Sequence, residues 1–432
     1  MLGWEFPPVF SGGLGIVTKN LLESLLRQGE DVTLLLPQFI ACQTGDIFKN
    51  GGIFSSTHKI NQRVEHYLRQ RIISIPTTIR SPYVSRTDYQ RDIASIQETK
   101  VFQSGTDKLS FFPSFTRKTN KKKIYGRDLF LEIERFVAEA LAATEGEYFD
   151  LVHAHDWITA EAALQLKFQR NIPFVLHIHA TEVDRVGQNP QDSEVFRREK
   201  YAMEVADKII AVSHYTKGIL VDTYGIDPNK IEVVHNAYTK KEAKVVASDR
   251  WQKDKSKFWV LFIGRVTLQK GPDYFVEMAR KVVEVNPNIH FLIAGDGDMM
   301  PGVIDQIARD KLSDNVHCLG FLSREDRDAL YLFTDACVIP SVSEPFGLTA
   351  IEGVFHLSPL VLSKTCGANE LIHHKLPVDF WDTDSMAEYV LALQKYPALR
   401  RTLRTKALHE LPHITWDTQA KLVGRVYESI SN

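Results

Sequence analysis

Cysteine is scarce in this sequence of 432 residues, and the four cysteines form no pattern. Cys42, Cys318, Cys337 and Cys366 are scattered without the spacing of metal ligands, and Cys318 and Cys337 lie in apolar, strand-like runs. This pattern is typical of reduced structural thiols in a cytoplasm. We therefore expect neither a metal site nor a cofactor from the cysteines.

Long apolar runs and an excess of one charge are also missing. No run approaches the roughly 18 residues that span a bilayer, and no secretory signal is visible. The formal net charge of −2 gives no general attraction to nucleic acid or to anionic membranes. The sequence predicts a soluble, cytoplasmic protein without a nucleic-acid partner.

Short apolar strands do alternate with helical runs, and they do so twice. This alternation predicts an α/β fold of βαβ units with parallel sheets, and the chain is too long for one ordinary core. A charged, weakly periodic segment at 242–257 is a plausible boundary. We expect two Rossmann-like domains that face each other across a cleft, spanning 1–241 and 242–412. The predicted strands are 32–36, 71–75, 151–155, 174–178, 208–212 and 231–234, then 258–263, 289–294, 316–319, 336–340 and 359–362.

A glycine turn, SGGLGIV (11–17), leads into the first predicted helix. Glycines at a helix start let backbone N–H groups approach an anion. A dinucleotide site wants an acid after the second strand, where this chain has Pro37 and Gln38. A nucleotide-sugar site and a purely structural turn both stay open. Only MLGWEF (1–6) precedes the turn, so the first strand is either unusually short or incomplete in this sequence.

Charged residues follow two predicted strands of the second half. Arg265 and Lys270 stand between Gly264 and Gly271, where they could neutralise a diphosphate. In SVSEPFGLTAIEG (341–353), Glu344 is expected in a strand-to-helix loop and Glu352 in the helix that follows. The plain alternative for all of these residues is a solvated surface. We interpret DGD (296–298) and DTD (382–384) as turns, not as metal sites.

Histidines follow two strands of the first half, in HAHDW (153–157) and LHIHATE (176–182). Each could be a structural histidine, but the carboxyl ends of parallel strands lie at one edge of a sheet. All of these groups are therefore predicted to converge on one cleft.

At this point the sequence resembles a known family, the retaining family 4 glycosyltransferases of the GT-B fold, in the branch with glycogen and starch synthases. The resemblance spans nearly the whole chain, and the spacing of the two glutamates is the E-x7-E element of such transferases. The segment 414–430 resembles the last helix of the fold, which implies that 413–432 crosses back to complete the first domain. The motifs are GWEFPPVFSGGLG (3–15), HAHDW (153–157), HIHATEVDR (177–185), AVSHYTKG (211–218), VVHNA (233–237), GRVTLQKGPDYF (264–275) and SEPFGLTAIE (343–352).

The resemblance implies roles for single residues. Glu344 would lie against the donor sugar, Glu352 would bind the ribose, and Asp156 would shape the acceptor side in the first domain. The catalytic set that it implies is Glu344, His179, Arg265 and Lys270. The donor-binding set that it implies is Gly12, Gly13, Phe346, Gly347, Leu348, Thr349 and Glu352.

The activity that the resemblance implies is transfer of a hexose, with glucose expected, from a nucleoside-diphosphate sugar to an α-glucan. It implies retention of configuration, with no metal and no cofactor. One departure leaves the donor open, because Phe10 stands where ADP-glucose-dependent synthases typically carry lysine. The alternatives are a capsular or lipid-linked glycan transferase, for which the basic run 117–123 could contact membrane, a sugar-nucleotide epimerase, and an inactive glycan-binding subunit.

Overall fold

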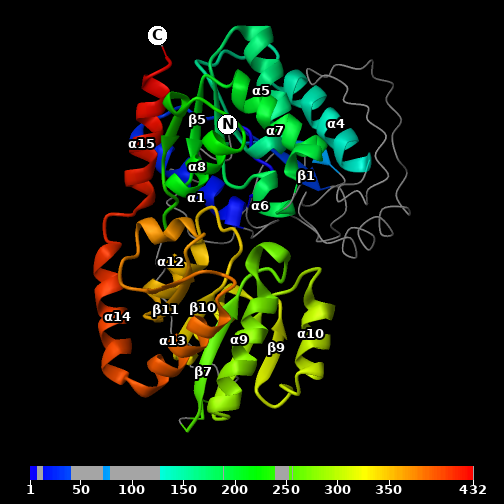
Figure 1. Ribbon diagram of the computed structural model, residues 1–432. Helices are drawn as coiled ribbons and strands as arrows, with labels where there is room; N and C mark the ends of the chain where they lie inside the picture. Colours follow the sequence, from blue (N-terminus) through cyan, green and yellow to red (C-terminus); the bar gives the residue numbers. More distant parts are fainter. Residues whose placement is uncertain are drawn as a thin grey trace, which may run out of the picture.

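The computed structural model describes residues 1–6, 13–39, 72–77, 127–187, 189–238, 253–254 and 256–431. The chain forms two α/β lobes, one above the other in Figure 1. Five sequence predictions lie outside the described residues: Gly12, Phe10, Cys42, the basic run 117–123 and the chain around the boundary at 241/242. The division into domains at that boundary stays a prediction.

The N-terminal lobe contains a parallel sheet of four strands in the order β3-β4-β5-β6. A second parallel pair, β1 and β2, is linked to it through Leu2, which bridges Leu35 of β1 and Ala154 of β3. Leu2 thus takes the place of the short first strand. The strands are β1 (Leu34–Phe39), β2 (Ile72–Thr77), β3 (Val152–His155), β4 (Phe174–Ile178), β5 (Lys208–Ala211) and β6 (Ile231–Val233).

Helices cover this lobe on both sides of its strands (Figure 1). They are α1 (Gly13–Gln28), α4 (Arg127–Ala143), α5 (Asp156–Arg170), α6 (Glu182–Val186), α7 (Glu194–Val205) and α8 (His214–Asp222), with short 3₁₀ turns at η1 (Pro190–Asp192) and η2 (Pro228–Lys230). The Leu2 segment lies between β1 and β3, so the strands follow the order β2-β1-Leu2-β3-β4-β5-β6. From Leu2 the chain order therefore runs toward both edges of the sheet. Loops after the Leu2 segment and after β3 flank this switch point, where doubly wound sheets bind ligands.

The C-terminal lobe has one parallel sheet in the order β12-β11-β10-β7-β8-β9. Its switch point lies between β7 and β10, so the loops after these two strands share one crevice. The strands are β7 (Phe258–Ile263), β8 (Ile289–Ala294), β9 (Val316–Gly320), β10 (Ala336–Ile339), β11 (Leu360–Ser363) and β12 (Leu376–Val378). The helices are α9 (Pro272–Val285), α10 (Met300–Arg309), α11 (Arg324–Phe333), α12 (Leu348–Phe355), α13 (Thr383–Lys395) and α14 (Pro397–Glu410), with 3₁₀ turns η3 (Leu268–Lys270) and η4 (Gly367–Glu370).

The last helix, α15 (Trp416–Glu428), leaves the C-terminal lobe and packs against α1 of the N-terminal lobe (Figure 1). This confirms the predicted crossing of the C-terminal helix. Ala420 and Val423 are fully buried in it, and at the surface Arg27 forms an ion pair with Asp417, with 2.7 Å between nitrogen and oxygen. Among the helices that the structure describes, none is long and apolar enough to cross a membrane.

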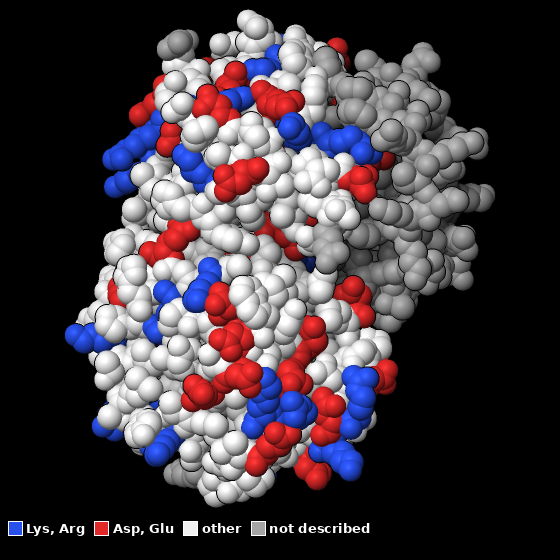
Figure 2. Space-filling view, in the orientation of Figure 1, with Lys and Arg blue, Asp and Glu red and all other residues white. Residues whose placement is uncertain are grey.

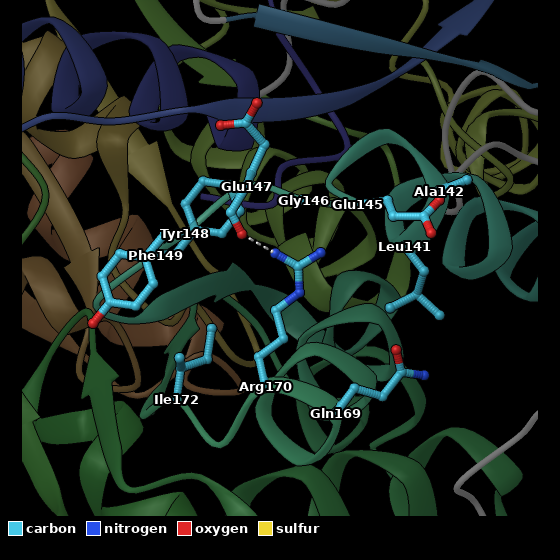
Figure 3. A pocket seen from close by; sticks show the side chains of 10 residues that line it. All are labelled: Leu141, Ala142, Glu145, Gly146, Glu147, Tyr148, Phe149, Gln169, Arg170 and Ile172. Atoms are coloured by element: carbon cyan, nitrogen blue, oxygen red, sulfur yellow. Dashed lines mark hydrogen bonds between the residues drawn. The ribbon is translucent and has the colours of Figure 1, made fainter.

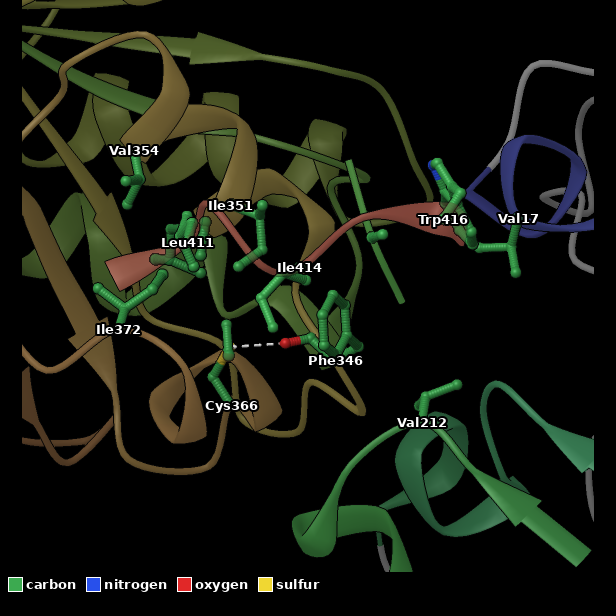
Figure 4. Packing of buried hydrophobic residues seen from close by; sticks show 14 of the residues in the cluster. Val17, Val212, Phe346, Ile351, Val354, Cys366, Ile372, Leu411, Ile414 and Trp416 are labelled. Carbon is green, nitrogen blue, oxygen red and sulfur yellow. Dashed lines mark hydrogen bonds between the residues drawn. The ribbon is translucent and has the colours of Figure 1, made fainter. Parts of the chain in front are cut away.

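One buried apolar cluster contains residues from both lobes. Val17 and Val212 contribute from the N-terminal lobe, Phe346 and Ile351 from the C-terminal lobe, and Trp416 from α15 (Figure 4). Burial of apolar area is the main source of stability in folding and association. The cluster therefore stabilises the arrangement of the lobes in which the two switch points lie close together.

Candidate active site

Lys270 and Glu344 form an ion pair at the C-terminal switch point. The Lys270 ammonium donates to Oε2 of Glu344, and the two side chains are only 16% and 9% exposed. The two loops are also joined through the backbone, because the carbonyl of Gln269 accepts from the amide of Val342 at 2.9 Å. Arg265 lies in the same loop, and its guanidinium donates to the side-chain oxygen of Gln269 at 3.2 Å. The structure brings Arg265, Lys270 and Glu344 into one group.

The backbone of Glu344 forms two hydrogen bonds with the loop that follows β11. Its amide donates to the carbonyl of Thr365 at 2.9 Å, and its carbonyl accepts from the amide of Gly367 at 2.9 Å. The loop after β11 therefore fixes the backbone that carries this carboxylate. The alternative of a solvated loop acid is wrong, since Glu344 is only 7% exposed.

Gly347 places the N-terminus of α12 beside Glu344. Its φ of +95° is one that residues with a side chain rarely adopt. A Cβ at this position would lie 2.6 Å from Sγ of Cys366 and 3.3 Å from Cγ of Glu344. The first amides of a helix have no partner within the helix and attract anions. Leu348 and Thr349, the first residues of α12, thus open a helix next to the Lys270–Glu344 pair.

Glu352 lies in the second turn of α12 and is only 8% exposed. The interpretation as a solvated helix acid is therefore wrong for Glu352 as well. Together with burial, which is the larger cause, the Glu352 carboxylate raises the pKa of Tyr331 well above its ordinary value. The Tyr331 hydroxyl donates to the carbonyl of Thr349 at 2.8 Å, so these groups share one buried region.

On the N-terminal side, Asp156 orients the backbone at His179. Asp156 begins α5 with a φ of +56°, and its Oδ1 accepts from the amide of His179 at 2.7 Å and from that of Ala180 at 3.4 Å. Burial raises the pKa of Asp156 to about 7, although the bond from His179 opposes the shift. Burial also lowers the pKa of His179 to about 3, so its imidazole is neutral at neutral pH.

The two sides of the site touch directly. A Cβ built on Gly13 would lie 3.6 Å from Cδ1 of Leu348, so the start of α1 faces the start of α12. Ser343, which precedes Glu344, donates to Oδ1 of Asp184 at 2.5 Å and pairs with the hydroxyl of Tyr215 at 2.9 Å. These contacts bring the start of α1, Asp184 and Tyr215 of the N-terminal lobe against the Glu344 loop and the start of α12.

Three of these contact residues were missed by sequence reasoning: Ser343, Asp184 and Tyr215. Only Asp184 left a local signal, because it completes a capping box with Thr181 at the start of α6. Hydrogen bonds between residues more than a hundred positions apart leave no periodicity in the sequence.

A separate pocket of about 590 Å³ lies away from these residues, between the end of α4 and the end of α5. Figure 3 shows Arg170 extending toward the backbone of Glu147, whose carbonyl accepts from it at 2.7 Å. None of the residues that line the pocket belongs to the predicted site.

Two lobes with parallel, doubly wound sheets, of which the second carries Arg265, Lys270 and Glu344 at its switch point, have the architecture of the GT-B glycosyltransferases. Family comparison agrees with this class. Residues 246–409 match the family described as "Glycosyl transferases group 1", and residues 99–240 match "Glycosyltransferase Family 4". The chain belongs to the family 4 glycosyltransferases of the GT-B fold and is glycogen synthase-like.

Relatives of similar length support the same conclusion. An uncharacterized glycosyltransferase of Methanocaldococcus jannaschii is 27% identical over 99% of this chain and 97% of its own. The glycogen synthase of Mycobacterium tuberculosis is 25% identical over 99% of this chain and 93% of its own.

Solved structures show the same fold. The sucrose-phosphate synthase of Thermosynechococcus elongatus has a TM-score of 0.70 at 19% identity, covering 99% of this chain and 95% of its own. Anabaena HepE, solved in complex with UDP-glucose, has a TM-score of 0.63 at 15% identity, covering 98% of this chain and 99% of its own.

Proposed function

We propose that this glycosyltransferase moves glucose from a nucleoside-diphosphate sugar to an α-glucan, with retention of the anomeric configuration. The observation that carries the proposal is the group formed by Arg265, Lys270 and Glu344 beside the N-terminus of α12. The similarity to a glycogen synthase and to a protein solved with UDP-glucose supports a glucosyl donor.

In this proposal the donor lies across the C-terminal switch point. Its diphosphate binds Arg265, Lys270 and the first amides of α12, because these groups concentrate positive charge on one point. Glu352 accepts hydrogen bonds from the ribose, and the sugar lies between Glu344 and His179. Gly12 and Gly13 approach the donor from the opposite lobe, and Asp156 faces the acceptor.

The chemistry is electrostatic. As the bond to the sugar breaks, negative charge grows on the leaving diphosphate, and Arg265 and Lys270 stabilise it without reorganisation. The carboxylate of Glu344 lies near the sugar, where positive charge grows. The leaving phosphate takes the proton of the acceptor hydroxyl, so the transfer step requires no separate base and no metal. Contact between the lobes keeps water from the donor.

The test is a panel of donors. UDP-, ADP- and GDP-glucose, GDP-mannose and UDP-N-acetylglucosamine are each assayed for release of nucleoside diphosphate, with and without malto-oligosaccharide. We expect release from a glucose donor, accelerated by the glucan and unchanged by EDTA, and an α-linked product by NMR. Activity only with mannose or N-acetylglucosamine would exclude the synthase-like function and leave the fold untouched.

A control variant identifies release by a contaminating enzyme. The double variant R265A/K270A, purified in the same way, should lose the glucan-dependent release. If the double variant released diphosphate as fast as the wild type, the measured activity would not belong to this site.

A further inference from the structure

Four histidines lie side by side on the N-terminal sheet. His153 and His155 are two positions apart on β3 and so point to the same face, and His155 is paired in register with His177 of β4. The ring centroids of the three are 4.6, 5.2 and 5.4 Å apart. His179 follows β4 and stacks on His177 with its centroid at 4.2 Å.

Three of these rings are buried and keep free nitrogens. His153, His155 and His177 are at most 2% exposed. Within the described part of the chain, Nε2 of His153, Nε2 of His155 and both ring nitrogens of His177 have no hydrogen-bond partner. A buried polar atom without a partner costs about 1–3 kcal/mol. Three such residues in one cluster therefore need an explanation.

In His153 and His155, the other ring nitrogen, Nδ1, forms a hydrogen bond. Nδ1 of His153 is bonded to the hydroxyl of Tyr427 on α15 at 2.5 Å, and Nδ1 of His155 to Nε2 of His179 at 2.8 Å. A histidine that binds a metal usually forms a hydrogen bond through the ring nitrogen that does not bind the ion. This bond fixes the orientation of the ring and leaves the other nitrogen for the ion.

We propose that His153, His155 and His177 bind one transition-metal ion of the Zn²⁺ type, through three imidazole nitrogens. One ring nitrogen from each residue lies within 4.8 Å of the others. A tetrahedral site with bonds of about 2.1 Å places them about 3.4 Å apart, so small side-chain rotations close the site. Imidazole ligands suit zinc, copper and nickel and exclude calcium and magnesium.

This metal site is structural and separate from the transfer step. It joins β3 and β4, and through Tyr427 it joins α15 to the sheet. An ion on Nε2 of His155 keeps the proton of that ring on Nδ1, from which it is donated to His179. The ion thus fixes which nitrogen of His179 carries a proton, without touching the donor.

The experiment measures metal content. The full chain, produced in medium with added zinc and desalted, is analysed by inductively coupled plasma mass spectrometry, and about one zinc per chain is expected. The variant H177Q should lose it, because one of the three ligands is gone. It should still fold, because the His177 ring forms no hydrogen bond within the described residues that the change would break. The matched control is H317Q, from a second stacked histidine pair with His290 on β8 and β9, and it should keep the zinc.

Two measurements on the wild type keep the test valid if H177Q does not fold. Cobalt-loaded protein should show the visible absorption of tetrahedral Co²⁺, and excess zinc should raise the melting temperature relative to EDTA. Wild-type protein with less than about a tenth of an equivalent of zinc, copper, nickel or cobalt after loading with each would overturn the proposal. So would zinc that H177Q binds as well as the wild type does.

Discussion

Lys270 shows how much of a residue's role depends on its surroundings. On a solvated surface, which is the plain alternative for this residue, Lys270 would contribute little to stability. In the folded protein it is mostly buried and forms an ion pair with Glu344, which comes from a different loop. Removing one partner of such a pair leaves the other charge without compensation. We therefore expect replacement of Lys270 to lower the melting temperature.

We predict that R265A and K270A each lower kcat on the order of 10²-fold, by analogy with the loss of one donor to a developing anion. The double variant should lose less than the product of the two single losses, because both residues act on one diphosphate. Steady-state kinetics of the three variants measures this. K270A should also melt at a lower temperature than R265A, since Lys270 is paired with a buried carboxylate whereas Arg265 donates to the neutral side chain of Gln269. A folded double variant that retains more than about a tenth of the wild-type kcat would remove both residues from the chemistry.

For Glu352 we predict an effect on binding. E352Q should raise the donor KM with little change in kcat, at a loss of about 1–3 kcal/mol, because the ribose would lose a charged acceptor in a buried place. Kinetics and calorimetric titration with the nucleoside diphosphate measure the loss. The exposed acid Glu428 of α15 offers a control, E428Q, which should bind the donor normally. Unchanged donor affinity in folded E352Q would assign Glu352 a structural role.

At the level of elements, the start of α12 depends on a conformation that glycine provides. Gly347 is the N-cap of α12, and its left-handed backbone turns the chain from the Glu344 loop into the helix. Cys366 fills the space where a side chain would be. The position of the helix N-terminus is therefore set by sterics at one residue.

We predict that G347A destabilises the protein by about 1–3 kcal/mol and weakens donor binding, because alanine must either shift Cys366 or move the turn. Thermal unfolding and donor titration measure both effects. The control is G218A in α8, where an added Cβ meets nothing within 4 Å and the helix gains from alanine. If G347A were as stable and bound the donor as well as G218A, the turn would not depend on glycine.

At the level of the whole molecule, the lobes are held together by polar contacts beside the shared apolar cluster. Glu370 of the C-terminal lobe accepts from the amides of His214 and Tyr215 at the start of α8, both at 2.9 Å, and from Nε2 of His235 at 2.8 Å. Figure 2 shows basic and acidic side chains mixed over the surface of both lobes on one face. The bonds of Glu370 thus add to the apolar cluster in joining the lobes.

Glu370 makes this contact sensitive to acid. Burial alone would raise the pKa of Glu370, but its hydrogen bonds from His235, His214 and Tyr215 outweigh burial and hold the pKa below its ordinary value. A carboxyl with a lowered pKa contributes stability above its unfolded pKa of about 4.5, and that contribution disappears as the pH falls through the folded value.

We predict that E370Q melts below the wild type at pH 7 and that the difference shrinks as the pH falls below about 4.5. Melting curves across this range measure it, and small-angle scattering reports whether the lobes separate. The exposed acid Glu145 provides a control, E145Q, which should follow the wild type at every pH. A difference between E370Q and the wild type that stays constant with pH would contradict the role of the carboxylate.

Much of the fold could be predicted because its signals are local. The strand expected at 174–178 is β4 (Phe174–Ile178), and the strand expected at 258–263 is β7 (Phe258–Ile263). The prediction failed at the edge of the strand expected at 32–36, which is β1 (Leu34–Phe39) and continues through Pro37. Pairing with β2 decides where that strand ends, and pairing is not a local property.

The sequence by itself determined the α/β class, the alternation of elements and the position of charged residues after β7 and β10, because strands, helices and turns follow from neighbouring residues. Only the tertiary structure decided that Lys270 pairs with Glu344 and that Glu344 and Glu352 are buried. It also decided that three histidines of β3 and β4 lie together with ring nitrogens that have no hydrogen-bond partner among the described residues. The ion pair and the histidine cluster each bring together residues from different elements, and burial depends on the packing of many residues. Their distances depend on strand order and on how the two lobes pack, and neither is written in any short stretch of sequence.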